Sequence, residues 1–119
     1  MQIEKDFTFD SAHFLPNVPE SHKCRRLHGH TYKATIIVEG ELLADQQWII
    51  DFAEIKSIVK PVIDRLDHHF LNAVPGLENP TVERIAQYLY EEIKPLLPLL
   101  SGIKVEETPT SRCTYHGKN

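Results

Sequence analysis

The tripeptide His28-Gly29-His30 contains the residues of this chain that are best suited to hold a metal ion. It opens a segment with the alternation of a β-strand, in which side chains two positions apart project to the same side. Two neutral imidazoles on one side, with no side chain between them at Gly29, can ligate one cation such as zinc. The alternative interpretation is a pair of surface histidines that flank a turn.

A metal site needs a third ligand, and His13 is the candidate that we favour. It ends an earlier segment of strand character, and an antiparallel partner can bring its last residue beside the first residues of the next strand. Three histidines and an open position form the layout of a catalytic zinc site, whereas structural sites are usually closed by four protein ligands. His22, His68 and His69 compete for the same place, and we expect His116 to be a solvated terminal residue.

Cys24 lies four residues before His28, beside Lys23, Arg25 and Arg26. Nearby cations stabilise a thiolate, which favours a reactive cysteine over a small inert residue in a dry core. Its role could be that of a fourth zinc ligand, a nucleophile or a general base. The same short basic stretch suits a small phosphorylated ligand better than a polymer, and any of its three cations could contact phosphate.

Two further pairs of residues could add proton transfer and ring recognition. Asp67 precedes His68, and a carboxylate beside an imidazole fixes its tautomer and raises its basicity. Asp67 could instead terminate a helix. Glu106 and Glu107 lie in an expected strand, so at most one of them points into a given site. That one could bind an amino-pyrimidine edge through paired hydrogen bonds, although two solvated acids are the alternative.

Length and composition favour a single enzyme-sized domain over residues 1–119. The chain is 41% apolar and 25% charged, as in ordinary soluble proteins. Its net charge of -4, without a basic run, predicts no nucleic-acid or membrane partner. The first residues lack the apolar run of a secretion signal, and Cys24 and Cys113 are far apart. We therefore expect two free thiols and a cytoplasmic location.

The apolar pattern predicts two strands, two helices and two strands. Residues 3–12 and 30–39 alternate with period two and are expected to pair antiparallel, and residues 102–108 and 112–116 predict two more strands. Asp51 predicts a helix N-cap, with Glu54 as the second half of a capping box. The buried stripe of this helix is expected at Phe52, Ile55, Val59, Val62 and Leu66.

Pro61 is expected to kink or split the first helix. Pro80 and Thr81 are predicted to open a second helix, whose apolar stripe comprises Val82, Ile85, Leu89 and Ile93. The fold class that follows is α+β, with a four-stranded antiparallel sheet and both helices on one face. The other face is half-polar and could meet solvent or another subunit, because a chain this short often builds its site at a subunit boundary.

Taken in order, these segments resemble the 6-pyruvoyl-tetrahydropterin synthase family. The motifs that carry the resemblance cover nearly the whole chain. They are Phe7-Thr-Phe-Asp-Ser-Ala-His13, Cys24-Arg-Arg-Leu-His28-Gly-His30, Trp48-Ile-Ile-Asp-Phe-Ala-Glu-Ile-Lys56, Leu66-Asp-His-His69, Leu71-Asn72, Glu78-Asn-Pro-Thr81 and Glu107-Thr108. The compact spacing from Cys24 to His28 resembles the bacterial 6-carboxytetrahydropterin synthase branch of the queuosine and 7-deazaguanine pathway. The animal 6-pyruvoyl enzymes have a longer insertion there.

The resemblance implies roles for seven residues: zinc ligands at His13, His28 and His30, a general base at Cys24, a proton relay at Asp67 and His68, and a pterin anchor at Glu107. It also implies the tunnelling fold, trimers whose sheets close into a barrel, hexamers of two stacked trimers, and active sites between subunits. The implied substrate is 7,8-dihydroneopterin triphosphate. With water it would give 6-carboxy-5,6,7,8-tetrahydropterin, acetaldehyde and triphosphate.

Three other interpretations compete with this one. The first is the sister activity, which eliminates triphosphate to give a 6-pyruvoyl product. The second is a cupin-like metal enzyme, since cupins also use two histidines separated by one residue, but cupins need many more strands and lack the two helices. The third is a non-catalytic zinc or pterin-binding module, which would keep His13, His28 and His30 but would not need Cys24, Asp67 and His68 together.

Overall fold

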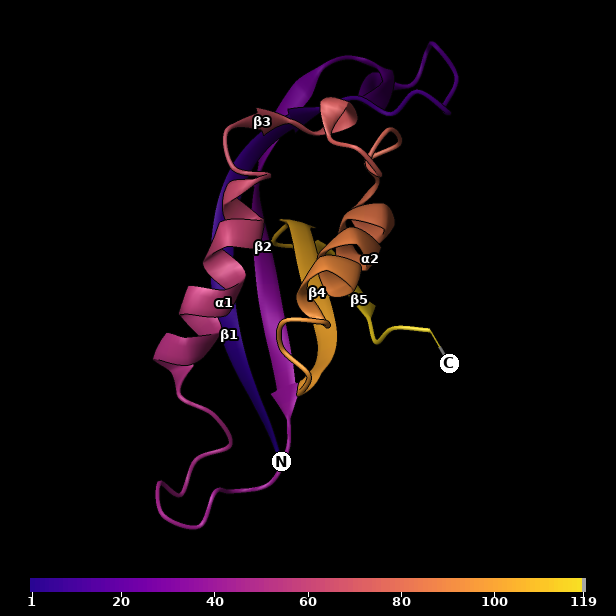
Figure 1. Cartoon of the computed structure of the whole chain (residues 1–119). Helices are drawn as coiled ribbons and strands as arrows, with labels where there is room; N and C mark the ends of the chain where they lie inside the picture. Colours follow the sequence, from indigo (N-terminus) through magenta and orange to yellow (C-terminus); the bar gives the residue numbers. More distant parts are fainter. Residues whose placement is uncertain (119) are drawn as a thin grey trace.

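The computed structural model describes residues 1–118, which form a curved sheet with two helices on one of its faces (Figure 1). The sheet has five strands in the order β3-β1-β2-β4-β5. The elements are β1 (Gln2–His13), β2 (His28–Glu39), α1 (Phe52–Asp64), β3 (His69–Phe70), α2 (Val82–Ile93), β4 (Leu100–Thr108) and β5 (Ser111–Tyr115), with 3-10 turns η1 (Lys23–Arg25) and η2 (Leu71–Ala73).

The hydrophobic core lies between the sheet and the helices. Alternate residues of β1, β2 and β4, including Phe9, Tyr32 and Ile103, point toward the helices and are almost fully buried. The residues that the helices bury are Ile55, Val59, Val62 and Ile63 of α1 and Ile85, Ala86, Leu89 and Ile93 of α2. The prediction that both helices cover one face is therefore confirmed. No helix within the described residues is long and apolar enough to span a membrane.

One strand distinguishes this sheet from the four-stranded antiparallel sheet that the sequence predicts. β3 pairs parallel with β1, with His69 opposite Ser11 and Phe70 opposite Ala12. The other three pairings are antiparallel, as predicted. The chain returns beside the end of β1 after α1, and a strand of two residues is too short to produce an alternating pattern. The observed order is therefore strand, strand, helix, strand, helix, strand, strand.

The first helix begins as predicted but differs in two details. The Asp51 carboxylate accepts the N–H of Ala53 at 2.9 Å, which confirms the N-cap. Of the kink or split predicted at Pro61, the split is wrong, since α1 continues through this residue to Asp64. Phe52 is 49% exposed and does not belong to the buried stripe. Side chains tilt toward a helix N-terminus, so the first side chain projects past the end of the helix.

The pairing of β1 with β2 determines where the candidate functional residues lie. The two strands have twelve residues each and pair continuously from Gln2 opposite Glu39 to His13 opposite His28. Their distal ends extend past the helices and carry the long connection of residues 14–27, at the top of Figure 1. The end of β1, the start of β2 and this connection therefore meet at one end of the molecule.

Candidate metal centre and catalytic pocket

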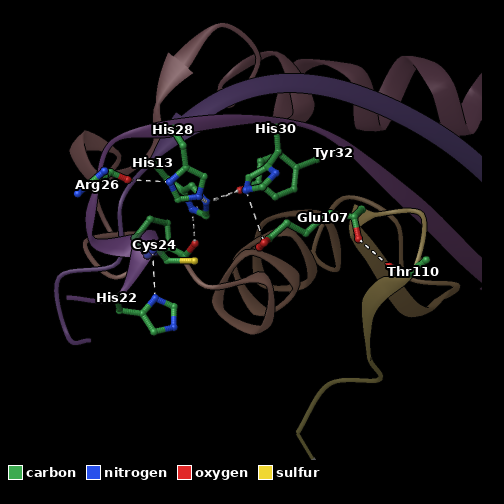
Figure 2. Close-up of polar contacts among 11 residues, drawn as sticks. His13, His22, Cys24, Arg26, His28, His30, Tyr32, Glu107 and Thr110 are labelled. Atoms are coloured by element: carbon green, nitrogen blue, oxygen red, sulfur yellow. Dashed lines mark hydrogen bonds and ion pairs between the residues drawn. The ribbon is translucent and has the colours of Figure 1, made fainter. Parts of the chain in front are cut away.

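Three histidines converge at the distal end of β1 and β2 (Figure 2). His13 lies directly opposite His28 in the ladder, and His30 lies on the same side of β2 as His28. One ring nitrogen from each of the three lies within 4.8 Å of the other two. His13 is buried, and the other two are half-buried. The rival third ligands His22, His68 and His69 lie outside this group.

The outer hydrogen bonds of the cluster determine which nitrogens face one another. Nδ1 of His13 donates to the Pro80 carbonyl at 2.9 Å, and Nδ1 of His28 donates to the Arg26 carbonyl at 2.7 Å. A carbonyl only accepts, so each Nδ1 carries the proton and each Nε2 presents a lone pair. The two Nε2 atoms lie 3.0 Å apart. Two lone pairs at this distance repel unless a cation or a proton lies between them.

His30 completes the donor set. Its Nε2 atom is buried and has no hydrogen-bond partner among the described residues, and the nearest charge is the Glu107 carboxylate, with Oε1 at 3.5 Å. Burial is the main cause that lowers the pKa of both His13 and His30 from 6.5. Both rings are therefore neutral near pH 7, which is the form that binds a metal. Three converging imidazoles, one with an orphaned nitrogen, fit a zinc ion with an open coordination position.

Cys24 and Glu107 face the same space as the histidines. A pocket of about 480 Å³ is lined by Lys23, Cys24, His28, His30, Glu107, Thr108 and Ser111. Cys24 belongs to η1, where its backbone N–H donates to Nδ1 of His22 at 3.0 Å and its carbonyl accepts from Leu15 at 2.7 Å. The Cys24 thiol is free and half-buried. Two histidines of the cluster, one thiol and one carboxylate therefore line a single cavity, and Figure 2 shows how these side chains lie with His13 beside them.

The two adjacent glutamates of β4 separate as the strand alternation predicts. Glu107 lines the pocket, whereas Glu106 projects to the other side and pairs with Lys33 at 3.4 Å. The three neighbouring cations also separate. The Arg25 guanidinium donates a hydrogen bond to the Val18 carbonyl at 3.1 Å, which links two parts of the 14–27 connection. Among the three, Lys23 is the one that lines the pocket.

Asp67 and His68 contact each other but lie apart from Cys24. Nδ1 of His68 lies 3.0 Å from Oδ1 of Asp67, which also accepts the backbone N–H of Asp10 at 2.9 Å. His68 lines a second pocket of about 640 Å³, which also includes His30 but neither Cys24 nor Glu107. Two other residues of this pocket, Asp10 and Thr31, occupy strand positions whose side chains alternate with those of His13 and His30. His68 also has a φ of 57°, a left-handed conformation that non-glycine residues rarely adopt and that often marks functional positions.

The Asp67 carboxylate gives a prediction about stability and pH. The hydrogen bond from Asp10, followed by the neighbouring His68, lowers the pKa of Asp67 below its ordinary value of 3.8. A carboxyl group whose pKa is lower in the folded state stabilises the fold above the unfolded-state pKa and loses this contribution as the pH falls. The difference in unfolding free energy between wild type and Asp67→Asn should therefore be largest near neutral pH and shrink below about pH 4.

Urea unfolding at several pH values measures this difference. Asp64→Asn is the control for losing one negative charge, since its exposed carboxylate pairs with Lys60 on the same helix. A difference between wild type and Asp67→Asn that grows toward acid pH would contradict the prediction.

Two residues near the site, Tyr32 and Asn72, were not identified as site residues by sequence reasoning. Tyr32 is fully buried with its hydroxyl 3.3 Å from both nitrogens of His13, and burial raises its pKa, so it stays protonated. The sequence could have indicated this, because Tyr32 lies two positions after His30 and therefore on the same side of the strand. Asn72 hydrogen-bonds Phe14 beside the cluster, and no local pattern indicates this. His116 is exposed, as expected from the sequence, and its Nδ1 lies 3.0 Å from the Ser101 carbonyl.

Comparisons with known proteins agree with this arrangement. A sequence profile described as 6-pyruvoyl tetrahydropterin synthase matches residues 2–118. The 6-carboxy-5,6,7,8-tetrahydropterin synthase of Synechocystis sp. is 36% identical over 119 residues, which cover 95% of this chain and 91% of that protein. The protein of the same name from Haemophilus influenzae is 36% identical over 139 residues, which cover 96% and 97%.

The fold is also that of a solved relative. The structure of Caenorhabditis elegans 6-pyruvoyl tetrahydropterin synthase superimposes with a TM-score of 0.92 at 27% identity, over 99% of this chain and 96% of that chain. The profile spans nearly all residues of this chain, and two relatives are 36% identical to it over most of its length. This chain therefore belongs to the 6-pyruvoyl tetrahydropterin synthase family.

Proposed function

We propose that this chain is a zinc-dependent lyase that acts on a dihydropterin, with the activity of a 6-carboxy-5,6,7,8-tetrahydropterin synthase. The substrate would be 7,8-dihydroneopterin triphosphate, which with water gives 6-carboxy-5,6,7,8-tetrahydropterin, acetaldehyde and triphosphate. The observation that supports this most is the pocket that His28, His30, the Cys24 thiol and the Glu107 carboxylate line together, with His13 completing the group of three converging imidazoles. Curated relatives at 36% identity carry this name. The pathway that we propose for this chain is 7-deazaguanine and queuosine biosynthesis.

Zn²⁺ would be held by Nε2 of His13, His28 and His30. When bound, it supplies Lewis-acid chemistry that favours deprotonation of the side-chain hydroxyls of the substrate. The Pro80 and Arg26 carbonyls keep two of the ligand rings in the tautomer that presents Nε2.

Two pocket residues have separate tasks in this reaction. Glu107 accepts paired hydrogen bonds from the amino-pyrimidine edge of the pterin, which orients the side chain of the substrate toward the histidines. Cys24, as a thiolate, removes a proton from a carbon of that side chain. Lys23, at the rim of the same pocket, is the cation that would contact the triphosphate.

Asp67 and His68 would complete the site from a second copy of the chain. His68 would donate and accept protons during cleavage of the carbon–carbon bond, with Asp67 orienting its ring through Nδ1. Within one chain His68 lines a different pocket from Cys24. Assembly into a trimer or a dimer of trimers is part of this proposal, and the single chain is elongated, with a radius of gyration of 15.4 Å. A compact monomer of this length would have about 13.5 Å.

Product analysis of the purified, zinc-loaded protein with 7,8-dihydroneopterin triphosphate tests the proposed activity. We expect equal amounts of acetaldehyde and the 6-carboxy product. A 6-pyruvoyl product without acetaldehyde would assign the sister activity instead. Zinc and pterin binding without turnover would indicate a binding module and contradict the proposed lyase.

A further inference from the structure

The side chain of Asn72 connects the two segments that hold His13. Its Oδ1 accepts the backbone N–H of Phe14 at 3.0 Å, and its Nδ2 donates to the Phe14 carbonyl at 2.9 Å. The same Nδ2 donates to the Glu78 carbonyl at 3.3 Å. One half-buried amide thus binds both backbone groups of one residue in the manner of a neighbouring strand, and also binds a second segment.

Both of these contacts lead to the metal centre. Phe14 directly follows His13, so Asn72 fixes the backbone at the point where β1 ends. Glu78 stands two residues before Pro80, whose carbonyl accepts the Nδ1 proton of His13 at 2.9 Å. The backbone position of His13 and the acceptor that orients its ring are therefore linked through one amide group.

The segment that carries Asn72 is itself well anchored. Leu71 and Leu77 are fully buried in the core. The backbone hydrogen bond from Val74 to Leu71 closes η2, and the bond from Leu77 to Val74 closes the turn that follows. The Asn72 amide is therefore presented from a rigid support. A residue with only acceptor atoms cannot replace it, because the Phe14 and Glu78 carbonyls both require a donor.

We propose that Asn72 is a positioning residue for the metal centre, which sets the place and ring orientation of His13. This inference rests on the zinc site proposed above and assigns part of its affinity to a residue that does not touch the metal. Residues that orient metal ligands from outside typically change metal affinity by about 10–100-fold when they are replaced. The effect on zinc should exceed any effect on the fold, since the remaining contacts of the core are untouched.

Two substitutions separate positioning from folding. Asn72→Asp keeps an acceptor for the Phe14 N–H but places a carboxylate against two carbonyls, and Asn72→Ala removes all three hydrogen bonds. Zinc affinity is measured on the apo proteins by competition with a chromophoric chelator, and the visible spectrum of the Co²⁺-loaded proteins reports ligand geometry. The matched control is Asn17→Asp, which makes the same chemical change at an exposed position of the 14–27 connection.

We expect both Asn72 variants to be folded by circular dichroism, to bind zinc about 10–100-fold more weakly, and to have an altered Co²⁺ spectrum. Asn17→Asp should match wild type. A folded Asn72→Asp with wild-type zinc affinity would overturn the positioning role alone, and so would the loss of the fold in both variants. A wild-type protein that binds no zinc would overturn the proposed metal centre itself.

Discussion

Replacing Cys24 with alanine is expected to abolish turnover while zinc remains bound. Cys24 lines the pocket with His28, His30 and Glu107, but the three ring nitrogens that converge there come from histidines alone. A general base typically contributes about 10²–10⁴-fold to the rate, and the loss should be of that size. Turnover is followed by acetaldehyde formation, and bound zinc is followed by metal analysis of the same sample.

Cys113 provides the matched control for this substitution. It is the other free cysteine, half-buried in β5, and burial raises its pKa, so it stays a thiol. Cys113→Ala should keep both zinc and turnover. Loss of zinc in Cys24→Ala would instead make Cys24 a metal ligand, and full activity in that variant would remove it from the mechanism.

A mixing experiment extends the test to the site between subunits. Cys24→Ala and His68→Ala should each be inactive alone. If every site takes Cys24 from one chain and His68 from another, random mixed oligomers regain activity in about one site in four. Mixtures that stay inactive after subunit exchange would contradict the proposal that the relay comes from a second chain.

Replacing His28 with alanine is expected to remove zinc and, with it, turnover. His28 contributes one of the three converging nitrogens, and its loss should weaken zinc binding by more than the about 100-fold found for residues outside the coordination shell. Zinc at 100 times its dissociation constant stabilises a folded protein by about 2.7 kcal/mol. Adding zinc should therefore raise the melting temperature of wild type and leave that of His28→Ala nearly unchanged.

His116→Ala is the control for removing a histidine. Its Nδ1 contacts a backbone carbonyl, as that of His28 does, but it lies near the C-terminus beside Ser101. This variant should retain the thermal shift with zinc. If His28→Ala binds zinc as tightly as wild type, the proposed centre at the end of β1 and β2 is wrong.

Much of the fold could be predicted because it follows local rules. The period-two alternation of β1 and β2 indicates their pairing, and the Asp51 side chain marks the start of α1. The exposed Phe52 and the uninterrupted passage through Pro61 were not predicted, since both depend on where the helix ends and what surrounds it. β3 was missed because two residues contain no periodicity.

The candidate metal centre was also predictable, and for the same physical reason. Strand geometry places His28 and His30 on one side, and antiparallel pairing brings His13 opposite His28. The sequence alone therefore determined that three imidazoles could meet at one end of a hairpin. It did not exclude His22, His68 or His69, because each could have reached the same place from a loop.

Only the tertiary structure decided how these residues are oriented and divided. The bond from His13 to the Pro80 carbonyl spans 67 positions, and that from Asn72 to Phe14 spans 58. The structure also places Cys24 and His68 in different pockets. Such contacts arise where separate segments pack together, and no helical or strand period encodes them. Local chemistry thus specified which side chains could act, and packing specified which of them share a cavity.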